Sequence, residues 1–492
     1  MSHLHFMGIG GVSMQGLARW WHADGHRVSG CDAVDGPATQ ALRVLGLQVW
    51  HGHDPRHLDH DVDTLVTSMA VPADHPEVVR ARALGLRVVP RIGLLGELFE
   101  RRAAIGITGT HGKSTTTGLT ATLAMAAEVD PSVHIGASLT GLPYNVRYGG
   151  GRLLVAEVDE SDPGFALLRP SVAVVTNLED DHVAGEFDER RNYHASMHDL
   201  ERATVRFANA AEHVLYCLDW PGLDDLLGHH PGAARYGTDP AAEYHVFAVE
   251  RTLEGSRFAL RLPSGRSARA ELRIPGQHNV LNAAAALAAV DLAGLDAEAL
   301  APALADFRGV GRRWQRWGEV AGALIVDDYA HHPTEVAATL ATARHSGRRV
   351  RAVLQPHRWV RTARHWPALA EAARLADEVL VLDVYASGER AIDGVSAALI
   401  VERLRSSGTM ASHHSMASAI SYLRATLAAN DLVLTLGAGD VWQVAEALVQ
   451  HATASADGAV AAAPDGRSAA SATTEGLRIA TVAAGVRSEP DA

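Results

Sequence analysis

The chain of 492 residues is too long for one ordinary domain, and its length predicts three. Hydrophobic residues make up 47% and charged residues 21% of the chain, as is usual for a soluble globular enzyme. The formal net charge of −13 argues against a nucleic-acid partner or an anionic membrane surface, because such partners bind basic faces. We find no signal peptide, no membrane span and too few cysteines for a disulfide framework, so we expect a cytoplasmic protein.

The first hundred residues predict a Rossmann-like α/β unit, because short apolar runs alternate with helical patterns. The expected strands cover 3–8, 26–32, 47–50, 64–71 and 86–90, and the first expected helix covers 12–22. Gly8, Gly10 and Gly11 follow the first strand, but Ser13 stands where a dinucleotide fingerprint has its third glycine. Asp32 ends the second strand, where a ribose-binding acid is expected. This loop predicts a nucleotide or diphosphate site, with a purely structural turn as the alternative.

A second unit, expected over 101–308, opens with a glycine-rich phosphate loop. The run GITGTHGKST, residues 106–115, follows a strand and begins a long helix. Glycines let backbone N–H groups approach phosphate oxygens, and the helix N-terminus adds partial positive charge. Lys113 can reach the terminal phosphates and the Ser114 hydroxyl can ligate Mg²⁺, although Ile107 replaces the first glycine of the strict motif.

Only one of the 44 basic residues is a lysine, Lys113. The codon bias of a GC-rich genome would explain the arginines but not this exception. A lysine ammonium is a compact point charge that fits a tight phosphate cradle, whereas arginine presents a planar fork. The lone lysine therefore favours a functional phosphate loop over an ordinary strand-to-helix turn.

Acidic residues end two later strands of the second unit, expected over 152–160 and 172–181. Strand alternation would put Glu157 and Asp159 on one face, and His182 follows the second strand. Ligands of parallel sheets bind at the carboxyl ends of strands, and carboxylates beside a triphosphate suit Mg²⁺. Each acid alone is more often a solvated surface group, but their clustering favours a metal site. An antiparallel hairpin is expected around 245–263.

The third unit, expected over 309–450, again alternates strands and helices, which predicts another doubly wound sheet. Its expected strands cover 323–332, 349–358, 378–385 and 431–440. From position 451 the chain turns to Ala, Ser, Thr, Gly and Pro without an aromatic residue. Such a composition cannot bury enough surface to fold, so we expect 451–492 to be a disordered tail.

Ten motifs give residues 3–447 a resemblance to the Mur ligase family. They are GIGGVSMQGLA, TSMAVPADHPEV, GTHGKSTTT, EVDESD, TNLEDDH, PGQHNVLNAAAA, GVGRRW, DDYAHHPTEV, QPHRWVRT and GAGDVW. One such motif is weak, but ten in the family's order and at similar spacing are specific. The resemblance implies a three-domain α/β fold: a Rossmann-like N-terminal domain for the UDP-substrate, a P-loop-type central ATPase domain with a parallel sheet, and a Rossmann-like C-terminal domain.

Within the family, the motifs are most similar to those of the alanine-adding branch. The resemblance implies a ligase of peptidoglycan precursor synthesis, serving cell-wall biogenesis, cell shape and cell division. It would join L-alanine to the lactyl carboxylate of UDP-N-acetylmuramate through an acyl phosphate, using ATP and two Mg²⁺ ions. The resemblance implies small-molecule partners only, and a monomer or homodimer.

The resemblance also implies a role for each matching residue. The catalytic residues would be Lys113, Glu157, His182 and Arg313, and the metal ligands Ser114, Glu157 and His182. ATP would be bound by Gly109, Thr110, Gly112, Lys113, Ser114, Thr115, His278, Asn279, Asn282, Arg313 and Asp328. The UDP-substrate would lie against Gly8, Gly10, Gly11, Asp32 and Ser68, and the amino acid against His357, Arg358 and Arg361. Taken alone, the run containing the last three would be a solvated basic turn.

Some positions depart from the family pattern. Ser114 replaces the usual threonine but keeps the hydroxyl, and Ala184 takes the place of an acid after His182. The ligases that add the later amino acids carry a carbamoylated lysine near the metals, which a chain with Lys113 alone cannot supply. Three alternatives stay open: a ligase that attaches a recycled tripeptide to the same acceptor, a nucleotide-dependent oxidoreductase, and a non-catalytic nucleotide-binding regulator.

Overall fold

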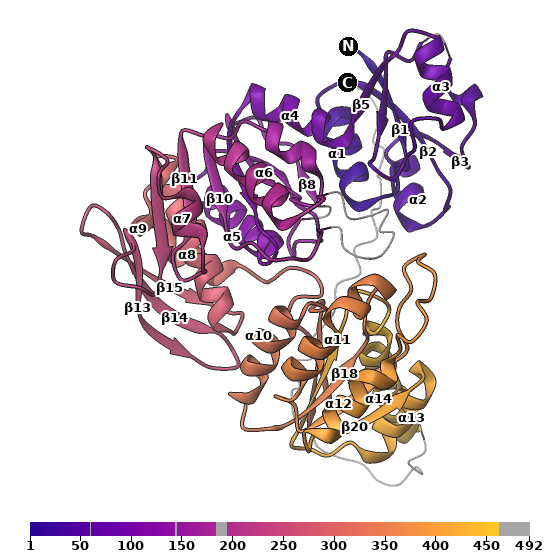
Figure 1. Ribbon diagram of the computed structural model, residues 1–492, viewed down its shortest axis with the longest axis vertical. Coiled ribbons are helices and arrows are strands. Elements are labelled where there is room, and N and C mark those ends of the chain that lie inside the picture. The colour runs from indigo at the N-terminus through magenta and orange to yellow at the C-terminus, as the bar shows by residue number, and fades with distance from the viewer. Residues whose placement is uncertain (60, 143–144, 184–193, 462–492) are drawn as a thin grey trace, which may run out of the picture. The chain divides into compact units, whose positions relative to one another are not determined.

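The computed structural model describes residues 1–59, 61–142, 145–183 and 194–461, and from position 452 onward it describes the backbone alone. Within these ranges the chain forms three α/β sheets, one after another in sequence (Figure 1). The α/β class and the parallel sheets expected from the sequence are confirmed. No helix in this described part of the chain is long and apolar enough to cross a membrane.

The N-terminal sheet is parallel throughout. Its elements are β1 (His3–Met7), α1 (Val12–Ala23), β2 (Arg27–Asp32), α2 (Pro37–Val44), β3 (Gln48–His51), the 3-10 helix η1 (Pro55–His57), β4 (Thr64–Thr67), α3 (Pro76–Ala83), β5 (Arg87–Pro90) and α4 (Arg91–Arg101). The strand order is β3-β2-β1-β4-β5, so the order reverses between β1 and β4. Ligands of such sheets bind in the crevice at this switch point. Gly8 follows β1 there, and Ser68 follows β4.

The central sheet carries the phosphate loop between its first strand and first helix. Its elements are β6 (Ala103–Thr108), α5 (Lys113–Ala126), β7 (Ser132–His134), β8 (Val146–Arg147), β9 (Leu153–Glu157), η2 (Pro163–Leu167), β10 (Val172–Val175), α6 (Met197–Asn209), β11 (His213–Cys217), α7 (Leu223–Leu227), β12 (Ala233–Gly237), β13 (Tyr244–Arg251), β14 (Ser256–Arg261), β15 (Ser267–Leu272), α8 (Gln277–Leu292), α9 (Ala297–Leu300) and η3 (Ala301–Asp306). The order is β15-β14-β13-β12-β11-β10-β6-β9-β7-β8. The strands from β7 to β13 along this order are parallel, and the expected antiparallel hairpin is confirmed as β13 and β14.

The strand before the first acidic cluster is shorter than we expected. β9 ends at Glu157, so Asp159 lies beyond the strand and the alternation argument for a shared face was wrong. The backbone stays near the sheet for one more residue, because Val158 N–H donates to the Ile107 carbonyl. The chain then turns, and the Asp159 carboxylate accepts hydrogen bonds from the backbone N–H and the hydroxyl of Ser161.

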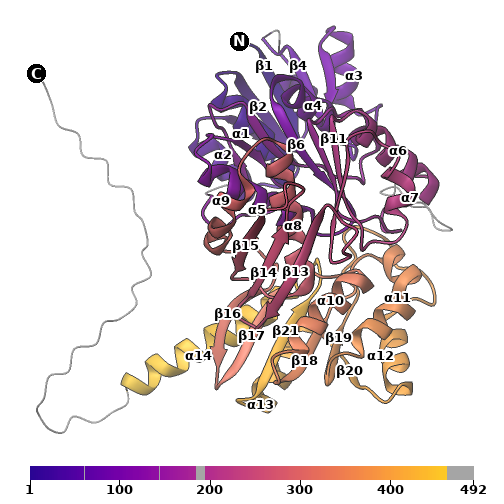
Figure 2. The same cartoon turned by 90° about the vertical axis from the view of Figure 1, so that its left-hand side faces the viewer.

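The C-terminal sheet is parallel except at one edge. Its elements are β16 (Gln315–Val320), β17 (Ala323–Asp328), α10 (Pro333–Arg344), β18 (Arg349–Leu354), α11 (Trp359–Ala373), β19 (Glu378–Leu382), α12 (Ala397–Ser406), β20 (Met410–His414), α13 (Met416–Thr426), β21 (Asp431–Leu436) and α14 (Trp442–Ala461). The strands run in the order β16-β17-β21-β18-β19-β20, which Figure 2 shows, with β16 antiparallel to β17. Alternate residues of β17 and β21, such as Leu324 and Ile325, enter different apolar clusters. Both faces of this sheet are therefore covered, as expected for a parallel sheet.

The end of the chain differs in part from the predicted disordered tail over 451–492. Helix α14 continues to Ala461, so 451–461 is helical. Alanine is the best helix former, and the same Ala-rich composition that indicated disorder also favours helix. The rest of the predicted tail, 462–492, lies outside the described residues.

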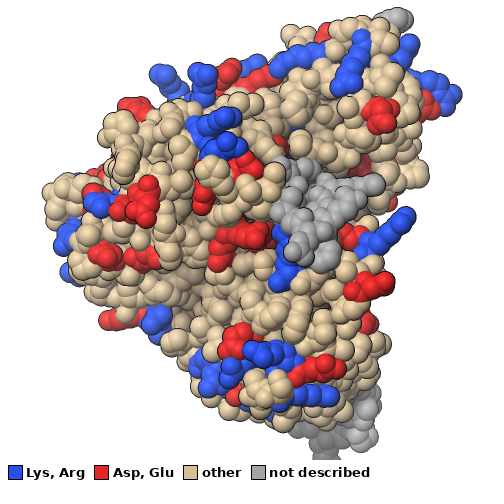
Figure 3. Space-filling model, in the orientation of Figure 1, with Lys and Arg blue, Asp and Glu red and all other residues tan. Residues whose placement is uncertain are grey.

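Acidic and basic side chains are interspersed on the face of the molecule that Figure 3 shows, and neither sign forms a continuous field there. This face therefore offers no continuous basic surface to bind phosphate.

Candidate active site

The phosphate loop takes a shape that only glycine allows at two positions. Gly109 has φ 128° and Gly112 has φ 80°, both in the region that L side chains rarely adopt. A Cβ at Gly109 would collide with the Thr176 hydroxyl, and one at Gly112 with the Asn282 side chain. Gly112 is the N-cap of α5, so the loop leads into a helix N-terminus that carries partial positive charge.

The segment after β10 holds this loop in place. The Asn177 side chain accepts a hydrogen bond from His111 N–H at 2.7 Å, and its carbonyl accepts one from Thr110 N–H at 3.2 Å. The Thr176 hydroxyl donates to the His111 carbonyl at 2.7 Å. These contacts hold the loop against the segment that follows β10.

Lys113 lies inside the loop. Its Nζ donates to the carbonyls of Gly109 and Thr110 at 2.6 and 3.1 Å, and it forms an ion pair with the Glu160 carboxylate at 2.7 Å. Burial alone would lower the pKa of Lys113, but the charges of Glu160 and Asp159 outweigh it and raise the pKa. The side chain is therefore an ammonium, held at the loop before any phosphate arrives.

A cavity of about 730 Å³ brings the phosphate loop together with the acidic cluster and the C-terminal domain. The predicted residues that line it are Gly112, Lys113, Ser114, Thr110, Glu157, His182, Arg313, His357, Arg358 and Arg361. Glu157 accepts a hydrogen bond from Gly136 N–H at 2.8 Å. Burial raises the pKa of Glu157, while Lys113, this N–H group and the Ser114 hydroxyl act against the rise.

The donors at this cavity fit a hard cation. Ser114 supplies a hydroxyl next to the Glu157 carboxylate, and the His182 imidazole faces the same space. The burial that disfavours the charge of Glu157 would be offset by a divalent ion beside it. Mg²⁺ prefers one or two carboxylates together with phosphate oxygens and water, and this set leaves room for both.

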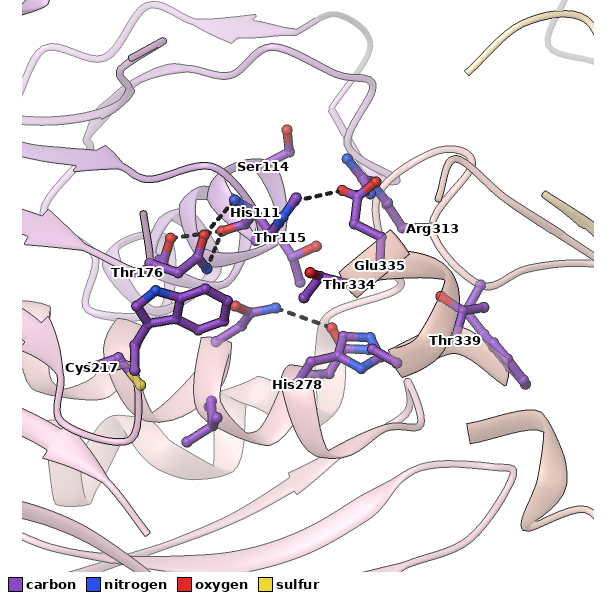
Figure 4. Close-up of a pocket in the computed structure, with 18 of the residues that line it drawn as sticks. His111, Ser114, Thr115, Thr176, Cys217, His278, Arg313, Thr334, Glu335 and Thr339 are labelled. Carbon is purple, nitrogen blue, oxygen red and sulfur yellow. Dashed lines mark hydrogen bonds and ion pairs between the residues drawn. The ribbon is translucent and has the colours of Figure 1, made fainter. Parts of the chain in front are cut away.

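A second cavity, of about 160 Å³, lies between the phosphate loop, α8 and α10 (Figure 4). It contains the predicted ATP residues His278, Asn279, Asn282, Arg313, Asp328 and Thr115. The Asn282 amide donates to the Asn279 side chain at 3.3 Å, and burial lowers the pKa of His278 to about 4, so the ring is neutral. Trp220 and Tyr236 add aromatic surface. A cavity lined by amides and aromatic rings suits a purine base.

The three residues predicted to bind the amino acid lie together on the larger cavity. Arg361 donates to both carboxylate oxygens of Asp181, at 2.7 and 3.2 Å, and its guanidinium also contacts His357 Nδ1 at 3.0 Å. Arg358 pairs with Glu389 and has φ 67°, which is rare for a residue with a side chain. Strained backbone of this kind clusters at functional sites.

In the N-terminal domain, Asp32 organises the glycine loop. One carboxylate oxygen accepts a hydrogen bond from Gly10 N–H at 2.8 Å, and the other accepts one from Val34 N–H at 2.9 Å. Gly8 has φ 71° and donates its N–H to the Cys31 carbonyl at 2.8 Å. The predicted UDP residues Gly8, Gly10, Gly11 and Asp32 thus form one connected turn, and Ser68 lies across the switch point from it.

Three family models match successive parts of the chain. The Mur ligase family, catalytic domain model matches residues 3–103, the Mur ligase middle domain model 107–290, and the Mur ligase, glutamate ligase domain model 312–439. The chain belongs to the Mur ligase family. The resemblance seen in the motifs is therefore confirmed, and this Mur ligase is an ATP-dependent ligase rather than an oxidoreductase or a non-catalytic regulator.

Individual relatives of this Mur ligase match it along almost its whole length. A UDP-N-acetylmuramate–L-alanine ligase of Deinococcus radiodurans is 45% identical, over 91% of this chain and 93% of that protein. One of Syntrophotalea carbinolica is 39% identical, over 91% and 97%. The solved UDP-N-acetylmuramate-alanine ligase of Thermotoga maritima has a TM-score of 0.77 at 27% identity, covering 92% of this chain and 100% of that one. A murein peptide ligase of Psychrobacter arcticus shares the fold, with a TM-score of 0.65 at 23% identity, covering 92% and 98%.

A set of acid–histidine contacts, which the sequence did not predict, connects the central domain of this Mur ligase to its C-terminal domain. His111 Nε2 lies 2.6 Å from Glu179, and its Nδ1 lies 3.3 Å from Glu335, which also pairs with Arg313 at 3.2 Å. His332 lies 3.2 Å from Glu179. These residues belong to quoted motifs, but nothing in one sequence indicates that segments more than 150 positions apart meet.

The pairing of His111 predicts that this Mur ligase is less stable at high pH. Burial alone would lower the pKa of His111, but hydrogen bonds to Glu179 and Glu335 outweigh it and raise the pKa to about 9. Because folding raises this pKa, protonated His111 stabilises the folded state. The stabilisation is complete below pH 6.5, the pKa expected in the unfolded chain, and it is lost as the pH rises through 9. We expect His111→Gln to remove on the order of 2–3 kcal/mol at pH 7 and much less at pH 10.

Denaturant unfolding of the wild type and of His111→Gln at pH 7 and pH 10 measures the free energy of unfolding, and so the loss that the substitution causes at each pH. His198→Gln is the matched control, because the side chain of His198 is 74% exposed and its ion pair with Glu201 is a surface contact. An equal loss of stability for His111→Gln at the two pH values would contradict the prediction.

Proposed function

We propose that this Mur ligase joins L-alanine to the lactyl carboxylate of UDP-N-acetylmuramate, with ATP converted to ADP and phosphate. The observation that carries the proposal is the larger cavity, where the phosphate loop of the central domain faces Arg358 and Arg361 of the C-terminal domain. The lactyl carboxylate, once phosphorylated at this loop, would lie in the same cavity as the amino acid that attacks it. The Deinococcus radiodurans relative, 45% identical over 91% of this chain, carries the name of that activity.

The reaction needs two steps because an amine does not displace oxide from a carboxylate. In the first, a lactyl carboxylate oxygen forms a bond to the γ-phosphorus and the bond to ADP breaks, which gives an acyl phosphate. In the second, the alanine nitrogen bonds to the acyl carbon, phosphate leaves, and the amine releases its proton to solvent or phosphate. The enzyme's contribution is to hold the reacting oxygens in line and to neutralise charge.

Each part of the site has a proposed task in this chemistry. Lys113 and the N–H groups of the glycine loop would hold the terminal phosphates, and Arg313 would contact them from the C-terminal domain. Ser114, Glu157 and His182 would hold Mg²⁺, which when bound reduces the negative charge of the phosphates; we propose two such ions. His278, Asn279 and Asn282 would contact adenine, Asp328 the ribose, and Gly109, Thr110, Gly112 and Thr115 the phosphates.

We propose further that the UDP-substrate lies at the N-terminal switch point and that the enzyme works in the cytoplasm as a monomer or homodimer. Its partners would be small molecules, without nucleic acid or membrane. Its product would supply peptidoglycan and hence cell shape and division. The expected domain boundaries, 1–100, 101–308 and 309–450, stay a prediction.

One assay distinguishes this function from that of the tripeptide-recycling ligase. Phosphate release is measured with UDP-N-acetylmuramate, ATP and Mg²⁺, adding single amino acids or a tripeptide in turn. We expect release with L-alanine and none with the tripeptide. Release with the tripeptide alone would replace the proposal with the recycling activity, and release with neither would remove both.

Arg358→Ala is expected to raise the KM for alanine by about 10- to 150-fold, the loss of one charged hydrogen-bonding group. Arg361→Ala should act in the same direction, but it also leaves the buried Asp181 without its partner, so Arg358→Ala is the cleaner variant. Steady-state kinetics with alanine varied provides the measurement. Arg374→Ala is the control, because Arg374 caps the far end of α11 and is exposed. An alanine KM that stays within twofold in Arg358→Ala would take this residue out of the amino-acid site.

A further inference from the structure

The N-terminal domain contains a cluster of metal-binding side chains away from the phosphate loop. His5 of β1, Cys31 of β2, His57 of η1 and Glu77 of α3 each offer a donor atom, and these atoms all lie within 4.8 Å of one another. His5, Cys31 and Glu77 are each 0% exposed, and the His57 side chain is 13% exposed. Four segments far apart in the sequence thus bring soft and hard donors to one buried point. We call it the His–Cys–His–Glu cluster.

The contacts inside this cluster are close. Cys31 Sγ lies 3.4 and 3.5 Å from the two carboxylate oxygens of Glu77, and His57 Nδ1 lies 3.3 Å from one of them. The Trp50 ring stacks on His57 at 4.7 Å between centroids, which fixes the plane of the imidazole. His53 lies on the outer side, with Nδ1 3.1 Å from Cys31 Sγ.

Two nitrogen atoms of the cluster, His5 Nε2 and His57 Nδ1, have no hydrogen-bond partner among the described residues. His5 Nδ1 shares a hydrogen bond with the Ser29 hydroxyl at 3.0 Å, whereas no described residue hydrogen-bonds to His5 Nε2, the ring atom on the other side. A buried polar atom without a partner costs about 1–3 kcal/mol.

We propose that His5, Cys31, His57 and Glu77 bind a zinc-type divalent cation. Sulfur with two imidazoles selects Zn²⁺ over Mg²⁺ or Ca²⁺, and four protein ligands without an open position are typical of a structural zinc site. The charges also balance, because one thiolate and one carboxylate neutralise a divalent ion in a buried place. Binding displaces the thiol proton, which now faces Glu77, and releases it to solvent.

The cluster is joined to the glycine loop of the N-terminal domain. The Cys31 carbonyl accepts hydrogen bonds from Gly8 and Ile9 N–H at 2.8 and 3.1 Å, and the next residue, Asp32, holds Gly10. A metal bound to the Cys31 side chain would therefore fix the end of β2, to which the glycine loop is hydrogen-bonded. It would act as a structural clamp, separate from the Mg²⁺ ligands in the central domain.

Cobalt(II) titration of the full-length, metal-stripped protein in excess Mg²⁺ tests the proposal. A thiolate ligand gives a sulfur-to-cobalt charge-transfer band in the near ultraviolet, and the Ser114, Glu157 and His182 set has no sulfur to produce one. We expect this band in the wild type, its loss in Cys31→Ser, and its retention in Cys217→Ser, the matched control with the other buried cysteine. No band in the wild type, or an unchanged band in Cys31→Ser, would overturn the site.

A measurement on the unaltered protein covers the case in which Cys31→Ser does not fold. X-ray absorption at the zinc edge of the zinc-loaded wild type should show one sulfur at about 2.3 Å and nitrogen or oxygen neighbours at about 2.0 Å. A first shell of nitrogen and oxygen alone would place the zinc elsewhere and refute the assignment.

Discussion

Lys113→Ala will lower kcat/KM for ligation by at least about a thousandfold, the scale on which phosphoryl-transfer enzymes lose activity when a phosphate-neutralising cation is removed. The ammonium of Lys113 already lies against the loop carbonyls, in the position to meet terminal phosphates. The fold should persist, because the hydrogen bonds that Thr176 and Asn177 make with the loop do not involve the Lys113 side chain. Phosphate release and amide formation measure the loss, and circular dichroism verifies the fold.

Two further substitutions make this prediction specific. Lys113→Arg should be almost as inactive as Lys113→Ala, because a planar fork does not fit a cradle that holds an ammonium at 2.6 Å from Gly109. Ser114→Thr, which keeps the hydroxyl, should retain activity within about tenfold. Unaltered turnover in Lys113→Ala would discard the phosphate-loop assignment altogether.

Arg351→Met will cost the C-terminal domain about 3–5 kcal/mol, the usual result of removing one partner of a buried ion pair. Arg351 is 0% exposed and contacts two buried acids, Glu378 at 2.8 Å and Asp431 at 3.1 Å. Its guanidinium also donates to the Thr426 hydroxyl at 2.8 Å. Without Arg351, the buried carboxylates of Glu378 and Asp431 lose the positive charge that offsets their own.

Hydrogen–deuterium exchange of peptides from β18, β19 and β21 measures this loss in the domain where it arises. Arg374→Met is the matched control, because its pair with Glu371 is exposed and should contribute less than about 1 kcal/mol. Equal exchange rates in Arg351→Met and Arg374→Met would contradict the stabilising contribution that we assign to the buried ion pairs of Arg351.

Local patterns predicted the parts of this protein that local chemistry determines. The loop at 106–115 needed only its glycines and Lys113, and the three mainly parallel sheets followed from alternating strands and helices. The strand before Asp159 was predicted too long because apolar alternation does not show where a chain leaves a sheet. The helix over 451–461 was missed because alanine suits both a helix and a low-complexity tail.

Contacts between segments far apart in the chain could not be predicted from the sequence. Glu160 belongs to the motif EVDESD, but it was not predicted as the partner of Lys113, and Asp181 was not paired with Arg361, which lies 180 positions away. The first pair depends on the pairing of β6 with β9 inside the central sheet, and the second on how the central and C-terminal domains meet. A single chain without aligned relatives contains no signal for such pairs.

Arg361 is already paired with a carboxylate of the protein, because both oxygens of Asp181 accept hydrogen bonds from it. In the proposed amino-acid site, an incoming carboxylate would displace Asp181 from this guanidinium, so the net gain would be the difference between two similar ion pairs. A neutral analogue, such as the amide of the amino acid, offers no charge to replace that of Asp181 and would bind less well.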